Sequence, residues 1–417
     1  MAPTPALKRS LSLGLLTLYG LGTTIGAGIF VLIGKVAGAG GELAPFSFLL
    51  AAFIAGLSAL SFAEFASRFP ESAGEAVYVN EGMSSSSLAL VVGLTVTVAG
   101  IVSTATIIVG FSGYLADVTA VPRNGAQVAM TILLAAIAIW GIRVSVSIAA
   151  LVTLIEIGVL VVILGFGVLG GPEVPAPDPL TPPTVPTTGV WAGMIYDALL
   201  AFYAFIGFED IVNVAEESRD ASRIVPKAIL LTLAVTTFLY VAIAHLAVST
   251  VALVTLAASD APLTILFERV SGLSGESVTV IAIVSVLNGA LIQIIMASRV
   301  LFGLTRRGWL PGPMNYIHPK TRTPIIAIIA CAMAVIVLSV SLPLENLALV
   351  TSYLTLCIFV VVNAALLKLK IKPDSRTHRG FVVPPVVPVL AIASICALIG
   401  HAGAGIGKRQ PDVVACG

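Results

Sequence analysis

The chain has 417 residues, of which 58% are hydrophobic and 10% are charged, with 22 Lys and Arg against 21 Asp and Glu. A soluble domain carries roughly 25% charged residues, so a water-soluble enzyme of this composition would expose apolar surface that it could not cover. The net charge of +1 gives no field that would attract nucleic acid. The composition therefore predicts a polytopic membrane protein.

Apolar runs long enough to cross a bilayer recur along the chain. A spanning helix needs about 20 mostly apolar residues. The runs are continuous and do not alternate as the strands of a barrel do, so we predict helices. The polar segment 71–87 is expected to lie at the inner surface, and the Pro-rich segment 171–189 to connect two spans outside the cell. The eleven predicted spans are residues 13–38, 44–67, 88–116, 125–142, 147–170, 190–215, 227–251, 277–304, 324–342, 346–368 and 382–400.

The Lys and Arg residues of the loops predict the orientation, because cytoplasmic loops carry an excess of them. With the N-terminus in the cytoplasm, most of these residues fall on the inner side. The sequence thus predicts a multi-pass protein of the plasma (inner) membrane with a cytoplasmic N-terminus. Two of the outer residues, Lys408 and Arg409, follow the eleventh span, which leaves open whether a tail lies outside or a twelfth span is missing. The five outer residues are Lys35, Arg123, Arg269, Lys408 and Arg409.

The first span contains four glycines within nine residues, at positions 20, 22, 26 and 28. Each glycine weakens a helix by roughly 1 kcal/mol relative to alanine, which predicts a break in mid-membrane. Free backbone groups there are tolerated where they line a cavity. The alternative is that Gly22 and Gly26 form a small-residue face on which another helix packs.

The sixth span carries a second irregular segment, in which Gly207 precedes Phe208, Glu209 and Asp210 inside an apolar run. A carboxylate within the membrane costs at least about 2.5 kcal/mol, which marks a candidate functional site. The alternative places these carboxylates at a span end near water. Glycine-broken helices at positions one and six are typical of transporters with an inverted repeat and a substrate site at the midplane.

Several short motifs occur in the order found in one transporter family: TTIGAGIF at 23–30, AEF at 63–65 with RFP at 68–70 and GEAVY at 74–78, FIGFE at 205–209 with AEE at 215–217, and ASR at 297–299 with Gly308 and LP at 310–311. Together they resemble the amino acid–polyamine–organocation (APC) superfamily of permeases. The resemblance implies one all-α transporter domain over residues 1–417, with a LeuT-type 5+5 inverted repeat and broken first and sixth helices. Repeat one would cover about 11–170 and repeat two about 190–370, followed by an accessory eleventh helix at 382–400.

The resemblance also implies a substrate site. The unwound first helix would hold a substrate carboxylate through backbone N–H groups. Tyr203 would be an aromatic gate, and Glu209 would link the substrate to that gate. Asn288 and Gln293 of the eighth span could contact substrate or form packing hydrogen bonds. The first-helix residues are Thr23, Thr24, Gly26, Ala27 and Gly28, and the expected cavity walls are Ile101, Thr104, Phe202, Ala204 and Ile206.

Glu156 departs from the family, because some proton-coupled relatives carry a lysine in the middle of the fifth span. No Lys or Arg lies within a helical turn of it. A carboxylate buried without a cation favours its protonated form, so Glu156 is a candidate proton-coupling residue. The alternative is a protonated side chain that only bonds a neighbouring helix.

The resulting prediction is a secondary active transporter of amino acids that works by alternating access, coupled to protons or exchanging substrates. Its partners would be an amino acid, protons and the lipid bilayer, with no nucleic acid, cofactor or metal. An enzyme is not expected, because no nucleophile–base or metal-ligand cluster is apparent. A polyamine or organic-cation carrier is the runner-up, ahead of a membrane-embedded enzyme or a channel. Phe202, Ile206 and Ile101 favour neutral substrates, whereas Glu209 or Asp210 could receive a cationic one.

Overall fold

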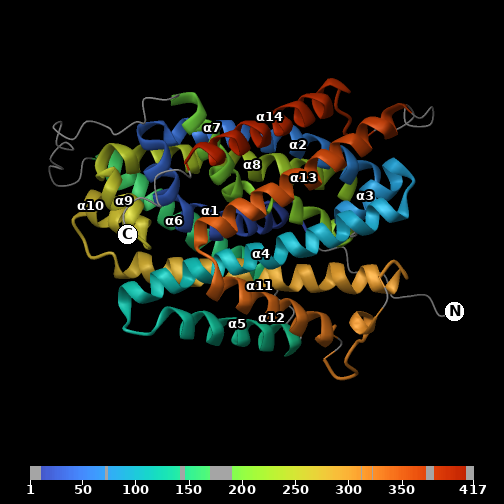
Figure 1. Cartoon of the computed structure of the whole chain (residues 1–417), viewed down its shortest axis with the longest axis horizontal. Helices are drawn as coiled ribbons and strands as arrows, with labels where there is room; N and C mark the ends of the chain where they lie inside the picture. The colour runs from blue at the N-terminus through green and yellow to red at the C-terminus, as the bar shows by residue number, and fades with distance from the viewer. Residues whose placement is uncertain are drawn as a thin grey trace.

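The computed structural model describes residues 11–70, 74–140, 146–169, 190–310, 312–321, 323–371 and 380–409. In these residues the fold is a bundle of helices (Figure 1), with one isolated bridge between Leu11 and Ser218. Seven helical stretches are long and apolar enough to cross a membrane, and three shorter apolar helices accompany them: Leu13–Gly26, Ile325–Ser341 and Val386–His401. The prediction of an all-α polytopic membrane protein is confirmed.

Each of the eleven predicted spans coincides with helical structure. The pairing of five helices with five others as an inverted repeat stays a prediction, and segment 171–189 lies outside the described residues. The corresponding helices are α1 (Leu13–Gly40), α2 (Ala44–Arg68), α4 (Ser86–Val118), α5 (Arg123–Trp140), α6 (Val146–Leu169), α7 (Val190–Phe202) with its 3-10 continuations η2 (Tyr203–Phe205) and η3 (Phe208–Glu217), α8 (Ala221–Thr250), α11 (Glu276–Arg306), α12 (Ile325–Ser341), α13 (Leu344–Ile371) and α14 (Val386–Arg409).

The remaining described helices are short: η1 (Gly41–Leu43), α3 (Gly74–Met83), α9 (Leu253–Ala258), α10 (Pro262–Ser271) and η4 (Pro313–Asn315). In the bundle, α1 contacts α6, α7, α8, α11, η2 and η3. Helix α4 runs along α11 and α13, and α2 along α8, while α5 and α12 lie together at one edge (Figure 1). The central position of α1 makes it the helix against which the others are packed.

Helix α1 corrects one expectation, because it is continuous from Leu13 to Gly40 and is not broken. Its glycines serve close packing. A Cβ on Gly28 would lie 2.5 Å from Ala204 Cα, and one on Gly26 would lie 3.0 Å from the Ser285 carbonyl oxygen. The contacts that these glycines permit offset their low helix propensity, so the small-residue packing face is what the structure shows.

The sixth span is broken as predicted. Helix α7 ends at Phe202, Ile206 is extended, and Gly207 has a φ of 124° before η3 begins. That φ favours glycine, and a Cβ there would also lie 2.7 Å from the Thr23 carbonyl oxygen. The Thr23 hydroxyl donates to the Gly207 carbonyl oxygen at 2.9 Å, so α1 satisfies a backbone group that the break exposes.

Helix α3 lies within the polar segment 71–87, and most of its residues are buried against other helices. The Tyr78 ring stacks on Phe65 of α2, with ring centroids 4.9 Å apart. Gly82 lies against Ala365 of α13, where a Cβ would come within 2.5 Å of the Ala365 carbonyl oxygen. These contacts dock α3 on the ends of α2 and α13. We call this end of the bundle the α3 end; the sequence predicts it to be cytoplasmic.

A buried ion-pair cluster joins three segments at the α3 end. Glu64 of α2 accepts from Arg68 one turn on at 2.7 Å and from Lys370 of α13 at 2.6 Å. It also accepts the backbone N–H of Val383 at 2.8 Å. Because Glu64 is fully buried, its charge depends on these two cations: removing one would leave the other as its counterion, whereas removing both would leave a buried charge unpaired.

Candidate substrate site

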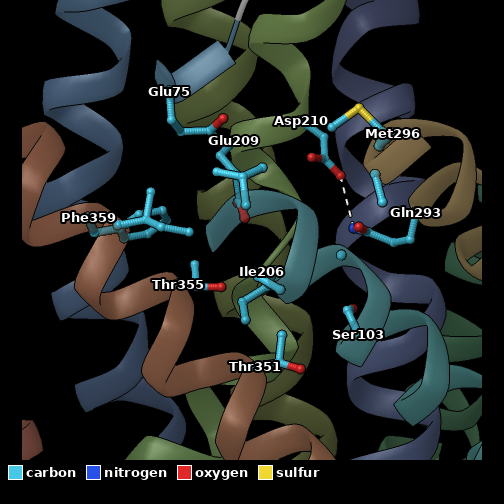
Figure 2. A pocket seen from close by; sticks show the side chains of 15 residues that line it. Glu75, Ser103, Ile206, Glu209, Asp210, Gln293, Met296, Thr351, Thr355 and Phe359 are labelled. Carbon is cyan, nitrogen blue, oxygen red and sulfur yellow. Dashed lines mark hydrogen bonds between the residues drawn. The ribbon is translucent and has the colours of Figure 1, made fainter. Parts of the chain in front are cut away.

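A small cavity, about 40 Å3 in volume, lies between α3, α4, η3, α11 and α13 (Figure 2). The break in the sixth span reaches it through Ile206, and α13 contributes polar side chains at i, i+4 spacing. Its lining residues are Glu75, Val96, Ala99, Gly100, Ser103, Ile206, Glu209, Asp210, Gln293, Met296, Ala297, Thr351, Thr355, Ile358 and Phe359.

Three carboxylates line one part of this cavity. Glu75 comes from α3, whereas Glu209 and Asp210 come from the first turn of η3, and all three are buried. Glu209 accepts the backbone N–H of Gly207 at 2.8 Å, and Asp210 accepts from the Gln293 side-chain amide at 3.1 Å. Burial raises the pKa of Glu75 to about 7. The lining contains no Lys, Arg or His, so the cavity presents net negative or protonated groups.

The other wall is apolar and rigid. Phe359 of α13 lines the cavity and packs against the rings of Phe62, Phe202 and Phe208, with centroids 5.1 to 5.9 Å apart. Ile358, Ile206 and Met296 are further apolar lining residues. Aromatic packing of this kind fixes the wall in place. The cavity therefore combines an acidic end with an apolar end.

The predicted site residues of the third and sixth spans divide into two groups. Ile206 and Glu209 line the cavity. Tyr203 lies behind the wall, where its hydroxyl is 3.2 Å from the Oγ of Ser103, a lining residue. The others do not line it: Phe202 and Ala204 are fully buried, the Thr104 hydroxyl bonds the Gly100 carbonyl oxygen of its own helix, and Ile101 packs between two apolar clusters.

The predicted residues of the first span lie outside the cavity lining. Thr23 bonds the Gly207 carbonyl, and the Thr24 carbonyl oxygen accepts from the Tyr240 hydroxyl at 2.8 Å. Gly26 and Gly28 pack against α11 and η2. The side chain of Ala27 lies outside what the structure describes. The first span thus packs against the broken sixth span and does not line the cavity.

Several lining residues were missed from the sequence. Glu75 stands in the GEAVY motif, but its segment was expected at the surface. Thr351 and Thr355 share one face of the tenth span, and this i, i+4 polar pair in an apolar run was the signal that could have found them, with Phe359 one turn further. The Gln293 amide, for which two interpretations were open, bonds Asp210 at the cavity.

Glu156 lies away from this cavity, in the interior of the bundle. It is fully buried in α6, and its Oε1 would be 3.8 Å from a Cβ on Gly26 of α1. Among the described residues, neither its carboxylate oxygens nor the buried Oγ of Ser285 meet hydrogen-bond geometry with a partner. Glu156 therefore faces the first helix, as the coupling hypothesis requires.

The sequence comparison identifies the family. Residues 12–410 match the profile of the amino acid permease family. The chain belongs to this family. Its membership in the APC superfamily, which the motifs suggested, is confirmed.

Relatives of this permease carry different names. It is 29% identical to the branched-chain amino acid permease BcaP of Bacillus subtilis, over 95% of this chain and 89% of the relative. It is 28% identical to the methylthioribose transporter of the same organism, over 94% and 87%. It is also 28% identical to cationic amino acid transporter 2, vacuolar, of Arabidopsis thaliana, over 98% and 67%. The substrates in these names are neutral, cationic and sugar-derived, so the relatives do not identify the substrate of this chain.

Proposed function

We propose that this permease is a secondary active transporter that moves amino acids across the plasma membrane by alternating access. The observation that carries the proposal is the cavity at the break of the sixth span, which brings polar and apolar side chains together inside the bundle. Exposed backbone within a membrane is tolerated beside such a cavity. The family match and the branched-chain amino acid permease among the relatives support an amino acid substrate.

The size of the cavity supports a moving transporter and argues against an open pore. Ligand pockets hold about 300–1,000 Å3, whereas this cavity holds about 40 Å3. An amino acid can enter only if η3, α3 or α13 move apart from α4 and α11. The substrate would place its ammonium group at the acidic end and its side chain against Phe359 and Ile206.

A polyamine or organic-cation carrier is the second candidate. It is supported by three carboxylates in a lining that has no cationic side chain to pair with a substrate carboxylate. The same feature keeps cationic amino acids, as well as neutral ones, among the candidate substrates.

The proposed coupling ion is the proton. Glu156 is buried, lacks a described hydrogen-bond partner and faces Gly26 of the central helix α1. Protonation would remove its charge without any other ligand, which would change how tightly α6 packs on α1. The N-terminus is proposed to be cytoplasmic, on the loop charges.

Uptake into proteoliposomes tests the proposal. The purified protein would be given radiolabelled neutral, cationic and acidic amino acids and polyamines, with and without an imposed pH gradient. We expect saturable uptake of an amino acid that the gradient increases. Uptake of polyamines alone would favour the second candidate, and uptake of neither class by folded protein would overturn both.

A further inference from the structure

Helix α3 forms one wall of the cavity although it is not one of the spans. Of the described lining residues, Glu75 alone belongs to it, in its first turn. The rest of the helix contacts α2 and α13. Lys368 of α13 donates to the Met83 carbonyl oxygen at 2.9 Å, Gly82 abuts Ala365, and Tyr78 stacks on Phe65. The far end of α3 is therefore anchored, while its first turn reaches across to η3.

The contact between α3 and η3 joins like charges. Glu75, Glu209 and Asp210 are 5%, 6% and 4% exposed, and all three line the same small space (Figure 2). Carboxylates buried side by side cannot all be ionised, because each repels the others in a medium that screens charge poorly. The first turn of α3 can therefore rest against η3 only when the cluster carries protons.

Among the described residues, the other elements around Glu75 supply no compensating positive charge. Helix α13 presents Thr351 and Thr355, α4 presents Ser103, and α11 presents Gln293, whose amide bonds Asp210. The one other titratable group near Glu75 on its own helix is Tyr78. The two lysines of α13, Lys368 and Lys370, bond the Met83 carbonyl and Glu64 and are absent from the cavity lining.

We propose that α3 is a proton-controlled gate, which closes the cavity while the cluster of Glu75, Glu209 and Asp210 holds protons and moves away from η3 when the cluster releases them. This inference rests on the proposed function in taking the cavity as part of the substrate path. It places a second proton-dependent element in the protein, separate from Glu156. Proton loss at this cluster would open the cavity toward the α3 end, so release of protons and of substrate would occur on the same side.

The movement of α3 can be measured directly by pulsed electron spin resonance. The four native cysteines are replaced by alanine, and spin labels are attached at Ala76→Cys in the first turn of α3 and Arg306→Cys at the end of α11. In nanodiscs, raising the pH from 5.5 to 8 should lengthen the distance between the labels. In the Glu75→Gln background the distance should stay at its low-pH value. A pH shift that survives Glu75→Gln, or a constant distance in the parent, would overturn the gate.

A second readout uses unlabelled protein with all cysteines intact. Glu75→Gln should remove the dependence of substrate exchange on the pH at the α3 end, whereas Glu81→Gln on the same helix should leave it unchanged. Equal effects of the two substitutions contradict the gate. The gate and the proposed function fail separately. Glu75-dependent movement without amino acid transport would discard the function alone, and transport with a pH-insensitive α3 would discard the gate alone.

Discussion

At the scale of single residues, two buried carboxylates lie at different places in the fold. Glu156 meets the central helix α1 and has no described hydrogen-bond partner. Glu209 lines the cavity and accepts the N–H of Gly207, the residue at which the sixth span breaks. Glu156 is the proposed coupling residue, whereas Glu209, besides its part in the proposed proton-holding cluster, bonds the backbone at the break. Substitutions at the two sites should therefore separate coupling from turnover.

Glu156→Gln, which mimics the protonated carboxyl group, should retain substrate binding and exchange but lose accumulation driven by a pH gradient. The reason is that glutamine keeps the volume and the neutral state but cannot release a proton. Counterflow and gradient-driven uptake in the same proteoliposomes measure the two activities. A glutamine variant that still concentrates substrate along the proton gradient would remove Glu156 from the coupling mechanism.

Glu209→Ala should reduce the turnover rate far more than it weakens substrate binding, because the lost hydrogen bond stabilises the backbone at Gly207 during the conformational step. We expect a fall in turnover of about tenfold or more, corresponding to roughly 1.4 kcal/mol. Scintillation proximity binding and initial uptake rates provide the comparison, with Glu81→Ala on an exposed face as the control. Equal losses of affinity and rate would place Glu209 on the substrate itself.

At the scale of elements, α1 and the sixth span form a complementary pair. The break in one is accommodated by the continuity and small residues of the other: Gly28 admits Ala204, and Thr23 bonds the Gly207 carbonyl. The sequence places four glycines within nine residues of the first span, at positions 20, 22, 26 and 28, but only Gly193 and Gly207 in the sixth. It does not show which helix breaks. Glycine lowers helix stability in both spans, and whether close packing against another helix offsets this loss depends on the tertiary structure.

Gly28→Ala should therefore destabilise the fold, because the new Cβ would lie 2.5 Å from backbone of η2. Overpacking of this kind costs about 1–3 kcal/mol. Gly158→Ala in α6 is the matched control, since nothing lies within 4 Å of its Cβ position. Thermal unfolding in detergent should show a lower midpoint for Gly28→Ala and an equal or higher one for Gly158→Ala. Equal midpoints would mean that α1 yields easily at this position.

At the scale of the whole molecule, stability should fall as the pH rises from about 4.5 to about 7. Burial raises the pKa of Glu75 from 4.5 to about 7, so the folded state binds more protons than the unfolded state between these values. Stability is therefore fully present below about pH 4.5 and is lost progressively up to about pH 7. The thermal midpoint of Glu75→Gln should vary less over pH 5 to 8 than that of the wild type. A pH profile identical in both proteins would contradict the burial argument.

The sequence predicts the eleven helices and the break at Gly207, because both depend on local composition. It does not predict the cavity. Ile206 and Glu209 belong to the irregular segment that the sequence reveals. Glu75, Thr355 and Phe359 reach the cavity only through the packing of α3 and α13, whose register depends on contacts such as Gly82 with Ala365. Such contacts join positions hundreds of residues apart and leave no periodic signal.

The ion-pair cluster at the α3 end also constrains how the chain can be made. Glu64 and Arg68 enter the membrane early in synthesis, but Lys370 and the Val383 N–H reach Glu64 only after the ribosome has added some three hundred residues. Until then α3 lacks Ala365 and Lys368, against which it docks. The early spans therefore stay loosely packed during synthesis. Contacts from the last third of the chain then complete the packing of the first third.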